Sequence, residues 1–296
     1  MSAHGFWHRL MHGTRRVWCR HEWRALAGDQ WDERIMSMPV TDRSHAKQGR
    51  STGRVILRNQ FGRMVVYLKR HRRLAWWRRA LATFWPDHGW SPAFAEWRHL
   101  QWAETLGIRV PEPVAAGEFV GPGFRLESFI AIKELTGMSP LHEAIPGAEF
   151  ALAASAFRSW KQKVVAEAAR LTRILHQAKR YHKDLYLCHF FAFDSLDPNA
   201  HQEGRVALID LHRLGYHPWT SWHWQVKDLA QLLYSSDIAG IDRRDRLRFL
   251  QLYLGRRKLD SNGRRLMHRV LAKAARYHRH NSKRARPAAR PEVKAA

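Results

Sequence analysis

The sequence predicts an α+β fold of two lobes, in which a small β-rich lobe precedes a larger, mostly helical lobe. Two runs rich in β-branched and aromatic residues, Arg54–Arg58 and Met64–Lys69, indicate a pair of strands. Apolar residues recur at helical spacing from Phe157 to Leu175 and indicate one long amphipathic helix further along the chain. A length of 296 residues suffices for one such two-lobed domain with tails.

Local signals define the elements of the first lobe. A turn around Asn59–Gly62 joins the two strand runs into a hairpin. Ser91 offers an N-cap, Pro92 suits the first helical position, and Gly107 ends the helix that they open. Phe129–Ile132 is typical of another strand, after which the chain becomes mostly helical.

The predicted organisation has four segments. We expect a basic, tryptophan-containing segment over residues 1–45, the small lobe over 46–135, the helical lobe over 136–280 and a disordered basic tail over 281–296. Lysine and arginine number 51 against 26 acidic residues, which gives a formal net charge of +25. The tail either keeps the chain solvated or contacts a membrane surface.

Composition narrows the classes of function. No apolar stretch approaches the ~20 residues of a membrane span, and Met1–Arg20 lacks the apolar core of a signal peptide. Cys19 and Cys188 form no disulfide framework, so we expect a cytoplasmic protein. The positive charge predicts a polyanionic partner, either nucleic acid, an anionic membrane surface or a phosphorylated substrate. No nucleic-acid-binding motif is present, so we expect no nucleic acid.

Two aspartates, 26 residues apart, carry the strongest functional signal. Asp184 follows a His-Lys pair in a polar loop, and Asp210 closes the apolar run Val206–Ile209. Phosphoryl transfer needs one carboxylate to orient and deprotonate a hydroxyl and another to hold the magnesium ion that bridges nucleotide phosphates. We therefore predict Asp184 as the catalytic base, Asp210 as a magnesium ligand and ATP as the phosphoryl donor. His189 is a second candidate for the metal, or else a structural hydrogen-bonding residue.

Lys69 closes an aliphatic strand run, the position at which a kinase places the lysine that contacts nucleotide phosphates. Its partner in a kinase is a glutamate on the following helix. Glu96 is the first choice and Glu104 the alternative. We predict that Lys69 and Glu96 form an ion pair that aims the ammonium group at the phosphates.

Three further segments complete the predicted nucleotide site. Gly49 and Gly53 lie in Lys47–Arg54, which either cradles phosphate with its backbone amides or is a plain hairpin. Glu134 and Leu135 follow a strand and form a candidate hinge whose backbone would meet adenine. Asp228 resembles the buried aspartate that braces the catalytic loop of kinases from the start of a helix.

The segments Tyr181–Phe190 and Leu208–Arg213 resemble the lipopolysaccharide core heptose kinase family, part of the lipopolysaccharide kinase group that includes the Kdo kinases. In that family a Tyr-x-Cys-His-Phe stretch follows the catalytic aspartate, and Ile-Asp-Leu-His-Arg replaces the kinase metal motif. The likeness spans about Gly49 to Leu254. It departs at Lys183, where the family has an arginine with its planar fork of donors.

This resemblance implies a protein-kinase-like fold and transfer of the γ-phosphoryl group of ATP, with magnesium, to a heptose of the lipopolysaccharide inner core. It implies two partners, the nascent lipid-linked core and the anionic cytoplasmic face of the inner membrane, where the enzyme would be peripheral. Our candidate docking patch comprises Arg70, Arg72, Arg73, Trp76, Trp77, Arg78 and Arg79. Two alternatives stay open: a kinase acting on Kdo or another hydroxyl acceptor, and a non-catalytic kinase-derived binding protein.

Overall fold

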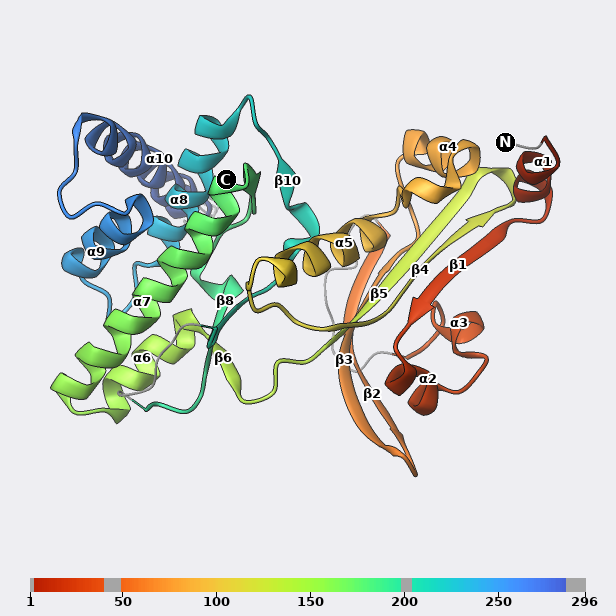
Figure 1. Ribbon diagram of the computed structural model, residues 1–296, viewed down its shortest axis with the longest axis horizontal. Coiled ribbons are helices and arrows are strands. Elements are labelled where there is room, and N and C mark those ends of the chain that lie inside the picture. Colours follow the sequence, from red (N-terminus) through yellow and green to blue (C-terminus); the bar gives the residue numbers. More distant parts are fainter. Residues whose placement is uncertain (1–2, 40–48, 198–203, 286–296) are drawn as a thin grey trace, which may run out of the picture. The chain divides into compact units, whose positions relative to one another are not determined.

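The computed structural model describes residues 3–39, 49–197 and 204–285, which divide into two compact units (Figure 1). Unit 1 contains Met1–Met138 and Ala207–Leu214, and unit 2 contains Ser139–Val206 and Gly215–Ala296. Unit 1 carries an antiparallel sheet and unit 2 is mostly helical, which confirms the predicted α+β class. Because the chain returns to unit 1 for Ala207–Leu214, Asp210 belongs to the same unit as the sheet.

The sheet of unit 1 has five antiparallel strands in the order β1-β4-β5-β3-β2. The strands are β1 (Thr14–Cys19), β2 (Arg50–Asn59), β3 (Gly62–His71), β4 (Pro113–Gly121) and β5 (Arg125–Lys133). The predicted hairpin is confirmed as β2 and β3, with Asn59 paired to Gly62 across the turn. Both strands are longer than predicted, because pairing continues through charged residues that carry no strand signal.

Helices cover both faces of this sheet. They are α1 (Ala3–Met11), α2 (His21–Ala27), α3 (Trp31–Arg34), α4 (Trp76–Phe84) and α5 (Pro92–Thr105), with 3-10 turns η1 (Pro86–His88), η2 (Pro122–Phe124) and η4 (Leu211–Arg213). Trp23 of α2 and Trp31 of α3 pack with Leu68 of β3 in one apolar core. Successive side chains of a strand point to opposite faces, so Lys69 faces away from that core, toward α5.

The start of α5 is as predicted. Ser91 is fully buried, and its hydroxyl accepts a hydrogen bond from the Phe94 amide at 3.3 Å. Pro92 occupies the first turn, where a missing amide hydrogen costs no helical hydrogen bond. Gly107 follows the helix with φ of +68°, a conformation that side-chain-bearing residues rarely adopt. The defined start and end of α5 fix the position of Glu96 next to Lys69 of β3.

Unit 2 is built from helices and very short strands. The helices are α6 (Leu141–Ala151), α7 (Ala154–Gln177), α8 (Ser221–Ser235), α9 (Arg243–Leu254) and α10 (Ser261–Ala285), with the 3-10 turn η3 (Leu187–His189). Its short strands are β7 (Arg180–Tyr181), β8 (Phe190–Phe193) and β10 (Gly215–Tyr216). Two more short strands, β6 (Met138–Pro140) and β9 (Val206–Leu208), contain residues of both units. The predicted long helix is confirmed as α7. Residues 286–296, most of the predicted tail, lie outside the described residues.

Among the helices in the described ranges, none combines the length and the apolar character that crossing a membrane would require.

Candidate active site

One cluster in unit 1 joins three elements that are distant in sequence. Lys69 Nζ of β3 lies 2.6 Å from Glu96 Oε1 of α5 and 2.7 Å from Asp210 Oδ1, just before η4. Lys69 and Glu96 are buried, and the Asp210 side chain is one-quarter exposed. The ion pair predicted between Lys69 and Glu96 is therefore present, and the structure adds Asp210 as a second acceptor for the same ammonium group.

The cluster keeps its charges. Burial acts to lower the pKa of Lys69, but the carboxylates of Glu96 and Asp210 outweigh it and raise that pKa above its ordinary value. Burial acts to raise the pKa of Asp210, but hydrogen bonds from His212 and Lys69 hold it well below the usual range. Asp210 is thus an ionised carboxylate near neutral pH, as a magnesium ligand must be.

Asp210 has a left-handed backbone, with φ of +61°. Such a conformation costs a residue with a side chain roughly 1–2 kcal/mol, so the surroundings must impose it. Just before it, the Leu208 amide donates to the Arg109 carbonyl at 2.9 Å. Just after it, His99 Nδ1 donates to the Leu211 carbonyl at 2.9 Å. Anchors on both sides of Asp210 therefore fix its carboxylate toward Lys69.

The two oxygens of Asp210 have different surroundings. Oδ1 accepts from Lys69 and from His212 Nδ1, the latter at 2.8 Å, whereas Oδ2 has no hydrogen bond to any described residue. Glu96 Oε2 is likewise buried without a partner in the described part of the chain. Among the residues that the structure describes, no group of three or more His, Cys, Asp or Glu side chains is placed to hold a metal ion. The donors fit magnesium, which binds through one or two carboxylates together with substrate phosphates.

The loop that carries Asp184 lies in unit 2 and is held by Asp228. This fully buried carboxylate accepts the backbone amides of His182 and Lys183, each at 2.8 Å. Lys183 has φ of +69°, and the two hydrogen bonds stabilise this turn. Asp228 is therefore confirmed as the brace, although it lies well inside α8 and not at the start of a helix. Because the brace acts on backbone amides, it does not require an arginine at position 183.

His189 contacts the backbone of the predicted base. Its Nδ1 lies 2.6 Å from the Asp184 carbonyl oxygen, which can only accept, so Nδ1 carries the proton. Nδ1 is thus engaged with the backbone, and Nε2 is the ring nitrogen left for a metal ion. His189 thus has the structural hydrogen bond that the sequence offered as one reading, and its metal ligation stays a prediction.

Lys227 of α8 contacts this loop and is a site residue that we did not predict. Its ammonium group donates to the Lys183 carbonyl and lies 3.9 Å from Asp184 Oδ1. The one sequence signal for it is its position next to Asp228 on α8, so that a single helix supplies both contacts. Lys227 therefore places a positive charge beside the carboxylate of the predicted base.

The structure also places the four remaining residues that we predicted to contact the nucleotide. Gly53 pairs with Leu68 inside the sheet, and Gly49 precedes β2 with φ of +74°. Residues 47–48 of the predicted phosphate cradle lie outside the described residues. The Glu134 amide donates to the Val65 carbonyl, and its carboxylate holds Arg54 in a two-bond ion pair. Leu135 follows it with a half-buried side chain. A role in nucleotide binding stays a prediction for all four residues.

The docking patch needs one correction. Arg70 is buried and donates to the carbonyls of Met36 and Met38, so it belongs to the interior of unit 1. It alternates with Lys69 along β3, and its side chain therefore turns toward α2 and α3. Trp76 and Trp77 are exposed as predicted, with 76% and 45% of their surface accessible.

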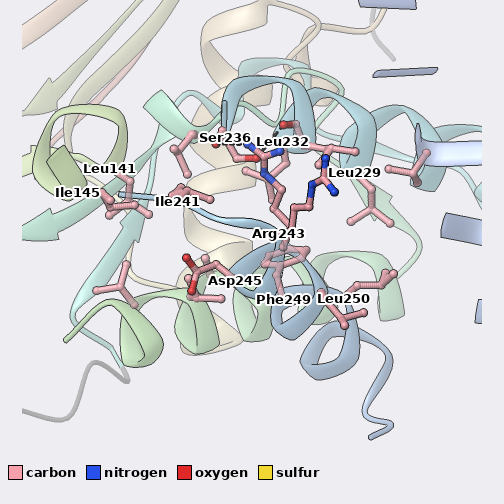
Figure 2. A pocket seen from close by; sticks show the side chains of 18 of the residues that line it. Leu141, Ile145, Leu229, Leu232, Ser236, Ile241, Arg243, Asp245, Phe249 and Leu250 are labelled. Carbon is pink, nitrogen blue, oxygen red and sulfur yellow. Dashed lines mark hydrogen bonds between the residues drawn. The ribbon is translucent and has the colours of Figure 1, made fainter. Parts of the chain in front are cut away.

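Unit 2 contains an apolar cavity of about 520 Å³ (Figure 2). Five helices and the segments between them line it, and the labelled side chains of Figure 2 include Leu141, Ile145, Leu229, Leu232, Ile241 and Phe249. Its polar lining comprises Ser236, Arg243, Asp245 and Arg246. None of the predicted site residues is among the described residues that line it, so the cavity is a feature separate from the phosphoryl-transfer groups.

Comparisons with known proteins agree with this geometry. The chain is 30% identical over 210 residues to the lipopolysaccharide core heptose(I) kinase WaaP of Pseudomonas aeruginosa, covering 69% of this chain and 75% of that protein. It is 29% identical over 183 residues to the enzyme of the same name from Escherichia coli K12, covering 61% and 68%. A solved structure described as WaaP in complex with acyl carrier protein superposes with a TM-score of 0.64 at 26% identity, covering 92% of this chain and all of that one.

The sequence model of the lipopolysaccharide kinase (Kdo/WaaP) family matches residues 44–253, well over half of the chain. The matched span includes Lys69, Glu96, Asp184 and Asp210, and its solved relative extends the likeness over most of the fold. Kinases of this family are phosphotransferases. The chain therefore belongs to the lipopolysaccharide kinase (Kdo/WaaP) family and is a phosphotransferase.

Proposed function

We propose that this enzyme transfers the γ-phosphoryl group of ATP to a hydroxyl of a heptose in the lipopolysaccharide inner core. The observation that carries this proposal is the 30% identity over 210 residues with a heptose(I) kinase. The buried Lys69–Glu96–Asp210 cluster supports it, because these are the side chains that hold a nucleotide and its metal in kinases. A non-catalytic scaffold would not need these three groups in contact.

Each group has a defined task in this proposal. Asp184 accepts the proton of the acceptor hydroxyl and orients it, while Lys227 lies beside the carboxylate and helps to hold the loop. Lys69, held by Glu96, contacts phosphate oxygens, and Asp210 offers Oδ2 to magnesium. Magnesium, when bound, neutralises charge on the phosphates. Leu135 and the Glu134 carbonyl meet adenine, and the Gly49 turn covers the phosphates.

The experiment that tests this function is transfer of label from γ-labelled ATP to lipopolysaccharide core acceptors that differ in their sugars. We expect label in a core that ends in heptose, at a heptose hydroxyl identified by mass spectrometry. Labelling of a Kdo-only acceptor, with none of the heptose core, would assign the enzyme to the alternative substrate. No transfer to any acceptor by a folded, ATP-binding protein would contradict the function.

We also propose that unit 1 docks on an anionic membrane through α1 and α4. Phe6 stacks on Phe84 with ring centroids 5.0 Å apart, which joins the two helices. The rings of Trp7 and Trp85 contact Phe6 and Phe84, and Trp76 begins α4; each of the three tryptophans is about half exposed or more. Exposed tryptophans suit the headgroup region, and the neighbouring Arg72 and Arg73 are exposed cations. Under this proposal the enzyme is peripheral on the inner membrane.

Reversing both charges with Arg72→Glu and Arg73→Glu is expected to weaken vesicle binding at least about 30-fold, since each basic residue near an anionic surface contributes about 1 kcal/mol. Flotation with phosphatidylglycerol vesicles measures this, and phosphatidylcholine vesicles report the charge-independent part. Arg265→Glu with Arg269→Glu on α10 removes equal charge from unit 2 as a control. Equal binding of the Arg72/Arg73 variant and the wild type would exclude this surface.

Finally, we propose that the cavity of unit 2 accommodates the acyl chain of an acyl carrier protein. The solved relative is described as a complex with such a protein. The cavity volume, about 520 Å³, is in the range of pockets that enclose a small ligand, and its lining is mostly aliphatic. Arg243 and Arg246 add positive charge for an acidic partner.

A ligand at about 100 times its Kd adds roughly 2.7 kcal/mol to stability, so acylated carrier protein is expected to raise the melting temperature measurably. Ile241→Trp fills the cavity from the segment before α9 and is expected to abolish that rise without lowering the melting temperature of the free enzyme. Carrier protein without an acyl chain is the control. An equal rise with the acylated and unacylated forms would contradict the role of the cavity.

A further inference from the structure

Arg50 is the first residue of β2, and among the described residues its side chain makes only one long hydrogen bond. Its Nη1 donates to His212 Nε2 at 3.3 Å, and its Nη2 lies 4.0 Å from Asp210 Oδ1, too far for a hydrogen bond. Because Nε2 accepts, the ring proton is on Nδ1, which donates to Asp210. The guanidinium is thus bonded to a ring nitrogen and not to a carboxylate. It is one-third exposed and carries donors that the protein leaves available.

His71 provides a second, independent observation at the same place. It is the cross-strand neighbour of Arg50 and lies on the same face of β3 as Lys69. The side chain is 7% exposed, and its Nδ1 has no partner among the described residues. Burial, together with the cations Arg50 and Lys69, lowers the pKa of His71 to about 3, so the ring is neutral. A buried polar atom without a partner is unfavourable, and it indicates a ligand atom that would complete it.

The charges of the cluster lead to the same conclusion. Lys69 is shared between two carboxylates, so its charge is already compensated. A triphosphate stays negative even with magnesium bound, and it needs a further cation at its oxygens. In other kinases the amides of a glycine-rich loop contribute here, but in this chain Gly53 lies inside the sheet ladder. Arg50 starts the same strand three residues earlier.

We propose that Arg50 leaves His212 when ATP binds and forms charge-assisted hydrogen bonds to the phosphates. A guanidinium matches the geometry of phosphate with two parallel N–H donors. It therefore supplies, from a strand, the positive potential that backbone amides supply elsewhere. This inference rests on the proposed use of ATP and names a phosphate-binding residue in addition to Lys69.

Isothermal titration with a non-hydrolysable ATP analogue and magnesium tests this. Arg50→Gln is expected to weaken binding of the analogue about 10- to 100-fold, the loss typical of hydrogen bonds to charged groups. Adenosine, which has no phosphates, is expected to bind the variant and the wild type equally and so reports that the pocket is folded. Arg58→Gln removes the same charge from the exposed end of β2 and is expected to bind the analogue like the wild type.

Arg50→Lys keeps the charge but loses the paired donors, so we expect a smaller loss of affinity for the analogue. If the glutamine variant does not fold, the lysine variant tests the proposal. Wild-type affinity of both variants for the analogue would overturn the role of Arg50 and leave the kinase function standing. A wild-type protein that transfers no phosphoryl group and binds no analogue would instead contradict the proposed function itself. Equal weakening for adenosine and the analogue would also overturn the inference, since the contact would then not be with phosphate.

Discussion

Asp184→Asn is expected to lower kcat for phosphoryl transfer at least about 100-fold, the usual contribution of a general base. The asparagine is nearly isosteric but cannot accept the proton of the acceptor hydroxyl. The loop should keep its shape, because Asp228 and His189 hold it through backbone atoms. Neither of these contacts involves the carboxylate of Asp184. Transfer of label to the heptose core, under saturating ATP, measures the loss.

Binding measurements separate a catalytic loss from a misfolded loop. The affinity of Asp184→Asn for the ATP analogue is expected to equal that of the wild type, since Asp184 contacts the acceptor and not the nucleotide. Asp194→Asn changes an exposed carboxylate ten positions further along the chain and is the matched control. Turnover near that of the wild type would remove Asp184 from the catalytic role.

The second large effect is expected for Asp210→Asn. An amide is a poorer magnesium ligand than a carboxylate, and metal stabilisation of transition-state charge is worth several kcal/mol, so kcat/KM should fall about 100-fold or more. Removing this charge also leaves Glu96 as the one carboxylate in contact with Lys69 among the described residues. The loss should appear as a higher magnesium requirement for binding of the ATP analogue, measured by titration at several magnesium concentrations.

Asp29→Asn, on the exposed surface of unit 1, controls for loss of one negative charge. The Asp210 variant is expected to unfold at a temperature close to that of the wild type, because its Oδ1 can still accept from Lys69 and His212. A magnesium dependence identical to that of the wild type would show that Asp210 is not a metal ligand.

The elements that could be predicted are those with local causes. The β2–β3 hairpin, the capped start of α5 and the periodic α7 each follow from signals within a few residues. The segment before residue 40 gave no such signal. β1 is an edge strand, and its first four residues are exposed. Because neither face of this part is buried, its sequence lacks the alternation of apolar and polar residues that indicates a strand. Its structure comes from pairing with β4, about a hundred positions away.

The candidate site divides in the same way. Lys69 and Glu96 could be predicted because each has a characteristic position within its own element. His212, Arg50 and Lys227 could not, because their significance comes from contacts with distant residues. Arg70 was misassigned to the surface because its neighbours in sequence are basic, while strand alternation directs its side chain inward. The apolar cavity is lined by residues of five helices, so no single segment of the sequence could have predicted it.

The return of the chain to unit 1 for Ala207–Leu214 has a consequence for how this enzyme can be built or divided. The strands of the sheet are synthesised first, whereas Asp210, which completes the cluster around Lys69, follows 77 residues after the end of β5 at Lys133. A fragment that stops at Met138 would possess Lys69 and Glu96 but not Asp210. Unit 1 contains Lys69, Glu96 and Asp210, whereas unit 2 contains Asp184. Neither unit alone therefore contains all the side chains that we propose for phosphoryl transfer.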